Sequence, residues 1–561
     1  MDNYTIAEEL QLLSKLMDIH GENAFKAKSY SAAAFAIEKF PQELSTLPKE
    51  KIFSIRGIGE SVGKKIAELI ETGELKALKE LLDKTPAGVL EMMNIKGLGP
   101  KKIHLLWKEL HISTIDELKE ACQQNRIAEK KGFGEKTQQK ILEAIHFQQQ
   151  SSGKFLYAQV ESFTEALQQK LVEKFETYRT EITGSFRRQL EVIEKLEWVT
   201  TVPKEKLLVF IDHQGFQLTS EGDDIIGCSS HEMVHMIFYL ADDDHFATKL
   251  FTTSSSPEFL MTLQQISNQP LLNEKSEEAI FQQYHLPYIP PYLREKEDIL
   301  INKNIPTAII QTSDIKGLIH AHSNWSDGGY AIDVMAHELI DLGFEYLVLS
   351  DHSKAAFYAS GLSEQRIKEQ HRLIDELNKE LTPFKIYKSI ECDILNDGRL
   401  DYEDQTLSTF DLVIASIHSN LDMTEEKAMQ RLMGAVNNPY VSILGHMTGR
   451  ILLRRKGYPV DHKAIIDACA ANNVVIEINA SPHRLDMDWR WIDYALERGI
   501  LLSINPDAHT LDEFALIKYG VLVAQKGALT KEKNLSSFSR KEFEAFLAQQ
   551  YQKRTKVQAT G

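Results

Sequence analysis

Apolar residues follow two different patterns along the chain, and the pattern changes near residue 308. Beyond that point, seven short runs rich in Val, Ile and Leu alternate with segments whose apolar residues recur every three to four positions. The runs are typical of strands buried on both faces, and the segments between them of amphipathic helices. The seven runs are KGLIHAH, YLVLSDH, FKIYKSIECD, DLVIASIHS, VSILGHM, NVVIEINA and ILLSINPDAH. They predict a parallel sheet covered by helices, and their number favours a closed (β/α) barrel over an open sheet.

Before residue 150 the pattern is helical, and a Gly-apolar-Gly sequence interrupts it three times. Gly57, Gly97 and Gly132 open these sequences at spacings of 40 and 35 residues, and an amphipathic pattern with early lysines follows each. A regular spacing of this size indicates repeated supersecondary units. The glycines allow a tight turn and a close approach of a ligand to the backbone, and the free N–H groups of the next helix suit a phosphate.

This repeated unit resembles the helix-hairpin-helix motif, which holds the DNA backbone without reading the base sequence. A single copy could equally be a turn between two helices that binds nothing. Three copies, each followed by lysines, favour DNA binding. The residues that we expect to contact DNA are Gly57, Gly59, Lys64, Lys65, Gly97, Gly99, Lys101, Lys102, Gly132, Gly134 and Lys136.

The composition is that of a soluble protein of several domains, with 561 residues, 43% of them hydrophobic and 26% charged. No apolar run approaches the roughly 20 residues that span a bilayer, and the first residues lack the basic-then-apolar pattern of a signal peptide. Four scattered cysteines without a CxxC pair argue for a reducing compartment and against disulfides or a cysteine-based zinc site. We therefore expect a cytoplasmic, nucleoid-associated protein with no membrane partner.

The net charge of −17 argues at first against a nucleic-acid partner. However, residues 1–150 hold 22 Lys and Arg and 22 Asp and Glu, so that all of the excess acid lies in residues 151–561. The distribution of lysines, and not the overall charge, decides whether a protein binds DNA. The charge therefore does not exclude DNA as a partner of the helical region.

Ionisable side chains stand at the ends of almost all the predicted strands. In chain order these are His320, His322, Asp351, His352, Glu391, His418, His446, Asp507 and His509, with Asp327 just beyond the first strand. A single histidine on an apolar face is usually a hydrogen-bonded core residue. In a parallel barrel, however, the carboxyl ends of all strands meet at one face, which is where catalytic groups converge. We therefore expect these residues to form one site.

The chemistry of this set points to a cluster of metal ions. His320 and His322 alternate with one residue, so that a regular strand would present both rings on the same side. Imidazoles and carboxylates without a thiolate suit Zn²⁺, Mn²⁺ or Fe²⁺, and the ligands are numerous enough for two or three ions. Clustered divalent ions suit phosphoryl chemistry because they acidify water and neutralise phosphate charge. Since the region contains no P-loop, hydrolysis is favoured over kinase-type transfer.

The motifs HAHSNWSDG, LSDHS, IECD, SIHS, GHM, EINASPHRLDMDW and NPDAH closely resemble the polymerase-and-histidinol-phosphatase (PHP) phosphoesterases over about residues 310–540. The resemblance implies a (β/α)7 barrel with up to three divalent ions, most plausibly Mn²⁺ or Zn²⁺. It implies His320, His322, Glu391 and Asp507 as ligands of the first ion, Glu391, His418 and His446 of the second, and Asp327, His352 and His509 of the third. Arg484, in SPHRLD, matches a position that contacts substrate phosphate, although a surface arginine near a turn is the simpler alternative. We also expect Asp351 to be catalytic.

The whole chain resembles the bacterial family X DNA polymerases. This resemblance implies an all-α helix-hairpin-helix region, an α+β nucleotidyltransferase-like palm and thumb, and a C-terminal PHP barrel. The expected divisions are 1–85 (N-terminal DNA-binding domain), 86–150 (fingers-like domain), 151–240 (palm), 241–305 (thumb-like domain and linker) and 306–561 (barrel).

The expected polymerase site is degenerate. The GS-x-RR motif of the family is present as Gly184, Ser185, Arg187 and Arg188, but Lys195 and Glu197 stand where the family places an Asp-x-Asp pair for two magnesium ions. A lysine puts a cation where Mg²⁺ must lie, and the longer glutamate arm fits octahedral Mg²⁺ poorly. Asp224 is the expected third carboxylate. We therefore predict a palm without nucleotidyl transfer and without Mg²⁺. Leu69, at the position of the lyase lysine in related repair polymerases, argues against lyase activity through that residue, and Lys64 or Lys65 is the alternative.

The predicted function is that of a DNA-binding, metal-dependent phosphodiesterase, a 3′–5′ exonuclease or 3′-end processing enzyme of DNA repair. The expected partner is gapped, nicked or primer-template DNA, and the expected state is a monomer. Two alternatives stay open. One is an active polymerase in which Glu197 and Asp224 hold a reduced metal site. The other is a DNA-binding scaffold whose barrel hydrolyses a small phosphomonoester.

Overall fold

The computed structural model describes the chain except for residues 39, 41, 56, 96, 268–270, 303–307 and 561. The chain divides into two compact units, Met1–Ser152 and Gly153–Gly561. The predicted boundary between thumb and barrel, 305/306, lies outside the described residues, and the five-part division remains a prediction. Within the described residues, every helix is too short or too polar to cross a membrane.

The first unit consists of helices around a single hydrophobic core, which extends from Ile6 to Ile145. Both predicted N-terminal domains therefore contribute to the same core. Its helices are α1 (Asn3–His20), α2 (Ala24–Glu38), α3 (Lys49–Ile52), α4 (Glu60–Thr72), α5 (Lys76–Lys84), α6 (Ala87–Met92), α7 (Pro100–His104), α8 (Ile115–Gln123) and α9 (Glu135–Ser151).

The three Gly-apolar-Gly sequences form turns that lead into α4, α7 and α9. The first glycine of each adopts a left-handed backbone, with φ of 96° at Gly57, 92° at Gly97 and 100° at Gly132. Other residue types adopt this conformation only at a cost, which explains glycine there. The second glycine of the first two turns, Gly59 and Gly99, has an ordinary φ of −77° at the start of its helix. The backbone therefore requires glycine at the first position of these two turns but not at the second.

The second unit begins with a palm-like sheet of five strands in the order β2-β4-β7-β6-β5. The strands are β2 (Thr180–Thr183), β4 (Leu196–Thr200), β5 (Gln217–Glu221), β6 (Ile225–Ser229) and β7 (His235–Leu240), and β1 (Phe155–Leu156) pairs separately with β3 (Val192–Ile193). The helices are α10 (Tyr157–Lys174), α11 (Gly184–Arg187), α12 (Lys204–His213), α13 (Phe246–Thr253), α14 (Pro257–Ser267), α15 (Glu277–Gln283) and α16 (Asp298–Asn302). The central pair, β4 and β7, is parallel, and the other pairs are antiparallel.

The rest of the second unit is a nearly closed barrel of seven parallel strands in sequential order. The strands are β8 (Gly317–Ala321), β9 (Tyr346–Leu349), β10 (Lys385–Asp393), β11 (Leu412–Ser416), β12 (Ile443–Leu444), β13 (Val475–Asn479) and β14 (Leu502–Asn505). A parallel bridge between Ala321 and Ala508 joins the first strand to the end of the last. The covering helices are α17 (Ile332–Asp341), α18 (Glu364–Glu380), α19 (Asp404–Leu407), α20 (Glu425–Val436), α21 (His462–Ala471), α22 (Ile492–Glu497), α23 (Ile517–Lys526) and α24 (Arg540–Thr560). The predicted (β/α)7 barrel is confirmed.

The palm and the barrel are packed together through the chain that follows α11. Glu191 accepts hydrogen bonds from the indole N–H of Trp489 at 3.0 Å and from Arg490 at 2.9 Å. The ammonium group of Lys526 donates to the carbonyl oxygen of Arg188 at 2.7 Å. Leu190, between them, packs against both the barrel core and the palm core. These contacts join the two parts into one body.

Candidate metal centre and nucleic-acid interface

The end of β8 departs from a regular strand at the first predicted ligand. The pairing of β8 with β9 skips His320, which has a left-handed φ of 67°. This is a β-bulge, which re-aims the side chains around it. The regular alternation expected from the sequence is therefore wrong, although His320 and His322 still lie close, with ring centroids 5.3 Å apart and both rings buried.

The strand ends bring the nine predicted ligands together around Glu391, which is fully buried at the C-terminal end of β10. The donor atoms of His320, His322, Glu391 and Asp507 lie within 4.8 Å of one another, as do those of His352, Glu391 and His418. His446 Nε2 lies 3.0 Å from Glu391 Oε1. The Glu391 carboxylate thus faces ligands from several strands, which is the position of a bridging group.

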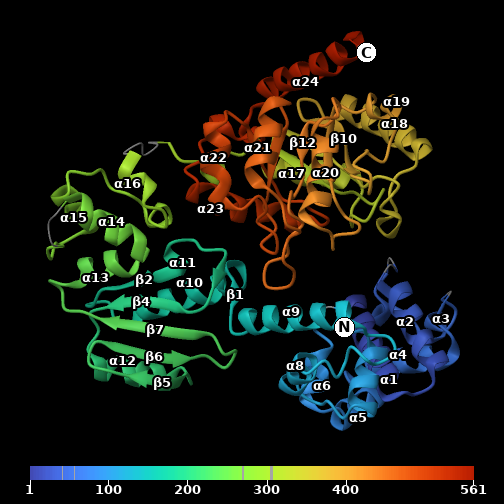
Figure 1. Ribbon diagram of the computed structural model, residues 1–561, viewed down its shortest axis with the longest axis horizontal. Coiled ribbons are helices and arrows are strands. Elements are labelled where there is room, and N and C mark those ends of the chain that lie inside the picture. The colour runs from blue at the N-terminus through green and yellow to red at the C-terminus, as the bar shows by residue number, and fades with distance from the viewer. Residues whose placement is uncertain are drawn as a thin grey trace. The chain divides into compact units, whose positions relative to one another are not determined.

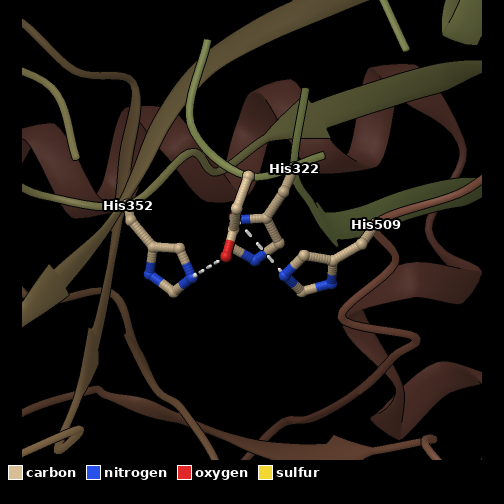
Figure 2. Close-up of side chains that lie close together, drawn as sticks. His322, His352 and His509 are labelled. Carbon is tan, nitrogen blue, oxygen red and sulfur yellow. Dashed lines mark ion pairs between the residues drawn. The ribbon is translucent and has the colours of Figure 1, made fainter. Parts of the chain in front are cut away.

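A third group consists of His322, Asp327, His352 and His509, whose donor atoms also lie within 4.8 Å of one another. Figure 2 shows the three rings turned toward a common point. The centroid of the His322 ring lies 4.4 Å from that of His352 and 4.3 Å from that of His509. Asp327, on the loop after β8, is within 3.9 Å of each of these histidines.

Several buried ligand atoms of this centre form no well-aligned hydrogen bond among the described residues, although His352 Nδ1 and Glu391 Oε2 lie 3.0 Å apart. They are His320 Nε2, His322 Nδ1, His352 Nδ1, His446 Nδ1 and Glu391 Oε2. Leaving such atoms unpaired in a protein interior costs about 1–3 kcal/mol each. Coordination of divalent cations by a nitrogen-and-oxygen set would compensate this cost. The residues present therefore fit divalent metal ions.

The mixture of imidazoles and carboxylates drives the pKa values of the centre in opposite directions. Burial lowers the pKa of His418, but Glu391 and Asp393 outweigh it and raise the pKa to about 10. Burial, together with the neighbouring His509 and His352, lowers the pKa of His322 to about 3. Burial raises the pKa of Glu391, yet the surrounding histidines hold it well below its ordinary value. Ionised carboxylates of this kind attract cations.

Sequence reasoning missed two carboxylates that orient the predicted ligands. Glu477, in the middle of β13, faces His320 Nδ1 at 2.6 Å, and Asp393 faces His418 Nδ1 at 3.2 Å. With Nδ1 of each histidine held by its carboxylate, the Nε2 atoms of His320 and His418 face Glu391. Carboxylates in this position fix the tautomer and orientation of metal-binding histidines. Glu477 had a signal in the sequence, since it is a charged residue within the apolar run VVIEINA.

The contacts of Asp351 do not match its predicted catalytic role. Its carboxylate accepts hydrogen bonds from the backbone and hydroxyl of Ser323, from the hydroxyl of Ser326 and from the amide of Gln370. Both oxygens are therefore occupied, and the residue belongs to none of the metal-binding groups in the described residues. Asp351 instead holds the loop that carries Asp327. Arg484 does reach the centre, with its Nε 3.9 Å from Asp507 Oδ2.

In the palm, an ion pair occupies the expected polymerase site. Lys195 stands directly before β4, and its Nζ lies 2.8 Å from Oε1 of Glu197 on that strand. The hydroxyl of Tyr239 on β7 donates to the same oxygen at 2.8 Å. Burial lowers the pKa of Lys195, but its hydrogen bond to Glu197 and their attraction outweigh burial and raise it. The other oxygen, Oε2, lies so close to Gly184 that a Cβ there would collide with it. The carboxylate is therefore surrounded by protein groups.

The arginines of the GS-x-RR motif are also paired. Arg187 donates to both oxygens of Glu277 and to the hydroxyl of Ser254. Arg188 forms an ion pair with Glu295. Gly184 and Ser185 form the first turn of α11. These contacts tie the motif to the thumb-like helices.

Asp224 does not join Glu197, and its prediction as a third ligand is wrong. Ile225 pairs with Tyr239, whose side chain lies on the Glu197 side of the sheet. Because side chains alternate along a strand, Asp224 belongs to the other face, and it is exposed. β7, the strand beside β4, carries no carboxylate at all.

The glycine turns of the first unit leave open space where a ligand would approach. A Cβ added at Gly59, Gly97, Gly99, Gly132 or Gly134 would meet nothing within 4 Å. At Gly59 and Gly99 neither backbone conformation nor internal packing requires glycine. The space beside these two positions leaves room for a close approach from outside the chain, as at a phosphate.

The lysines that we expect to bind DNA lie beside these turns, whereas Leu69, at the expected position of a lyase lysine, lies in the core. Lys64 and Lys65 pair with Glu60 and Glu68 on α4, and Lys102 donates to the carbonyl oxygen of Gly97 at 3.0 Å. Lys101 and Lys136 lie in the first turns of α7 and α9. Leu69 is fully buried in the core of the unit and therefore cannot present a group to DNA.

Comparison with known proteins agrees with both halves of this description. A helix-hairpin-helix domain model matches residues 1–75, and a model of the SAM-like helix-hairpin-helix tandem matches residues 89–146, which confirms the predicted motif. The chain is 32% identical over 568 residues to the DNA polymerase/3'-5' exonuclease PolX of Bacillus subtilis (strain 168), covering 98% of this chain and 99% of that protein. It is 27% identical over 211 residues to a probable phosphatase of Caldanaerobacter subterraneus, covering 34% of this chain and 76% of that protein. It is 29% identical over 118 residues to DNA polymerase lambda of Rattus norvegicus, covering 21% of this chain and 20% of that protein.

Proposed function

Because the chain belongs to the family X DNA polymerases that carry a C-terminal PHP domain, we propose that it is a DNA-binding, metal-dependent 3′–5′ exonuclease. One observation carries this proposal. Eight histidines and carboxylates from several strand ends and one loop converge around Glu391 and leave buried nitrogen atoms without a hydrogen bond in the described residues. Divalent cations would pair these atoms, and the family relationship favours DNA as the substrate.

We assign three ion positions to the ligand groups: His320, His322, Glu391 and Asp507; Glu391, His418 and His446; and Asp327, His352 and His509. Mn²⁺ and Zn²⁺ fit the nitrogen-rich set best, because Mg²⁺ prefers oxygen ligands alone. When bound, such ions lower the pKa of water and neutralise charge on phosphate.

The chain's own residues then have separate tasks. Glu477 and Asp393 hold the rings of His320 and His418 so that one nitrogen of each faces Glu391. Arg484, beside Asp507, is placed to donate to an oxygen of the scissile phosphodiester and so to orient it. Asp351 fixes the loop of Asp327 through Ser323 and Ser326.

The helix-hairpin-helix unit would hold gapped, nicked or primer-template DNA through its backbone. The open space at Gly59 and Gly99 supports this assignment. The palm would contribute binding surface but no nucleotide transfer. The Lys195–Glu197 ion pair and the absence of a carboxylate from β7 support this second statement.

The test is incubation of the purified chain with end-labelled gapped DNA and Mn²⁺, with and without deoxynucleoside triphosphates. We expect shortening by single nucleotides and no extension. A second arm addresses the phosphomonoester alternative, which the similarity to a probable phosphatase favours. DNA with a 3′-phosphate would lose inorganic phosphate without shortening if the barrel were only a phosphatase, and that result would overturn the proposal.

A further inference from the structure

A short loop follows the ligand His352, which lies just beyond the end of β9, and returns to this histidine. Leu362 donates its backbone N–H to the carbonyl oxygen of His352 at 2.8 Å, and Ser353 pairs with Leu362. The backbone N–H groups of Lys354 and Ala355 donate to the hydroxyl of Tyr402 and to the carboxylate of Asp401, at 3.1 and 2.6 Å. The base of this loop, residues 353–362, is therefore fixed beside the metal centre.

At the tip of this loop, two aromatic rings face solvent. The turn Phe357–Ala359 is anchored by Ala356 and Ala359, both of which are buried. Phe357 is 84% exposed, more than any other large hydrophobic side chain in the described part of the chain, and Tyr358 is 54% exposed. The two ring centroids are 5.9 Å apart. Because the alanines hold the turn in place, the ring of Phe357 is displayed by the fold and is not part of its packing, whereas the ring of Tyr358 is half-buried.

The loop that carries these rings begins beside the metal centre. Ser353 follows the ligand His352, and its hydroxyl lies 3.3 Å from the carboxylate of Asp393, which orients His418. Burial, followed by the charges of Asp393, Glu391 and Asp327, raises the pKa of Tyr358 to about 12, while Arg484 opposes this effect. The loop is also tied to the loop that carries Asp327, because the guanidinium of Arg366 bonds the carbonyl oxygens of both Ser360 and Trp325.

Arg484 approaches the metal centre from another strand end. Arg484 follows β13, and in the closed order of the barrel β14 and β8 stand between β13 and β9. The arginine and the exposed rings thus follow different strands that end at the same centre. A nucleotide likewise carries two chemically different groups, a charged phosphodiester that suits an arginine and a flat base that suits an aromatic ring.

We propose that Phe357 stacks on the nucleobase of the nucleotide whose phosphodiester enters the metal centre. This inference rests on the proposed function and narrows its substrate class to phosphodiesters of nucleosides. Stacking tolerates any base because every base has a π face, which suits an enzyme that must remove all four nucleotides.

Binding can be measured without hydrolysis. A single-stranded oligonucleotide with 2-aminopurine as its 3′ nucleotide is added to the full chain in EDTA, and stacking is read as quenching of its fluorescence. We expect quenching with the parent and with Phe357→Tyr, and its loss with Phe357→Ala and Phe357→Leu. Tyr551→Ala, which removes an exposed ring of α24, should quench like the parent. Equal quenching by the parent and Phe357→Ala, or no quenching by the parent, overturns the proposal.

A second measurement compares removal of an ordinary 3′ nucleotide with removal of an abasic one, in Mn²⁺. The loss of one base–aromatic stack corresponds to about a tenfold change, so the parent should prefer the base-bearing end by about that factor in kcat/KM. Phe357→Ala should bring the ratio close to one while leaving the abasic rate unchanged. A ratio that Phe357→Ala leaves intact contradicts stacking. If the parent removes neither end, the proposed exonuclease fails, and the quenching result still decides the stacking separately.

Discussion

Glu477 Oε2 lies 2.6 Å from His320 Nδ1, and both side chains are fully buried at the centre of the barrel. The carboxylate also accepts hydrogen bonds from Asn505 and from the backbone of His446. It therefore fixes which nitrogen of His320 faces Glu391, although it belongs to none of the metal-binding groups.

Glu477→Gln should weaken metal binding about 10- to 100-fold, because an amide stabilises the ring of His320 less well than a carboxylate does. Isothermal titration of the metal-free chain with Mn²⁺ or Zn²⁺ measures this. Glu497→Gln, an exposed glutamate of α22, is the matched control and should titrate like the parent. If Glu477→Gln bound metal ions as tightly as the parent, Glu477 would contribute to packing alone and not to the orientation of His320.

His320→Ala and Asp507→Ala should each abolish release of 3′ nucleotides, because each removes a donor atom from the group around Glu391. The affinity for DNA, measured by fluorescence anisotropy in EDTA, should stay within about twofold of the parent, since phosphate contacts come mainly from the first unit. Nuclease activity equal to that of the parent would exclude the barrel as the catalytic site.

Gly59→Ala combined with Gly99→Ala should weaken DNA binding equally on unrelated sequences, because the added methyl groups lie where a phosphate approaches. The backbone and packing at both sites accept alanine, so the free energy of unfolding should fall by no more than about 1 kcal/mol per site. Parent binding should decline with salt at a log–log slope of about −0.9 per phosphate contact.

Gly73→Ala provides the contrast for this pair. Gly73 ends α4 with a left-handed φ of 74°, and a Cβ there also meets nothing within 4 Å. Alanine should cost about 1 kcal/mol of stability and leave DNA affinity unchanged. If Gly73→Ala weakened DNA binding as much as the double variant, loss of folding would explain both results.

The unmodified palm should add no templated nucleotide in Mg²⁺, because the ammonium of Lys195 lies against the carboxylate that a metal ion would need. Primer extension on gapped DNA is the measurement, with His320→Ala as the background so that the barrel does not remove the product. Nucleotide addition at rates near 1 s⁻¹, an ordinary enzymatic turnover, would support the alternative hypothesis of an active polymerase. The double variant Lys195→Asp with Glu197→Asp would restore two carboxylates. It should still add no nucleotide, because β7 provides no third carboxylate.

Lys526 gives the second unit a pH dependence in the alkaline range. Burial lowers the pKa of Lys526 to about 7, from 10.5, although Glu295 and Glu191 oppose the shift. Between these two values the folded chain holds the lysine neutral while the unfolded chain binds a proton, so the free energy of unfolding should rise with pH, by at most about 1.4 kcal/mol per unit. Below pH 7 both states are protonated and this group adds no slope. Urea titrations from pH 7 to 9 should show the rise in the parent and a flatter profile in Lys526→Met, and parallel profiles would contradict the assignment.

The barrel and its ligands could be predicted because both depend on short-range patterns. Apolar runs separated by helical segments define parallel strands, and parallel strands bring their carboxyl ends to one face. The bulge at His320 could not be predicted, since it is a backbone response to pairing with β9. Asp351 and Glu477 are both acidic residues at the end of or within an apolar run, so the sequence alone does not distinguish them. Their hydrogen-bond partners do: Asp351 holds a loop through Ser323, and Glu477 orients the ring of His320. The prediction of Asp224 as a third metal ligand was wrong because the face on which this residue lies depends on the register of β6 with β7.

The residues just after the GS-x-RR motif have a consequence for how such a chain evolves. Leu190 belongs to the packing of two cores, and Glu191 receives Trp489 and Arg490 from the barrel. Selection for an intact barrel therefore preserves this part of the palm whether or not the palm performs chemistry. Lys195 and Glu197 pair instead with each other and with Tyr239 of the palm. Changes at these two positions therefore leave the contacts between palm and barrel in place, so that a palm of this kind can lose catalytic carboxylates and still support the neighbouring domain.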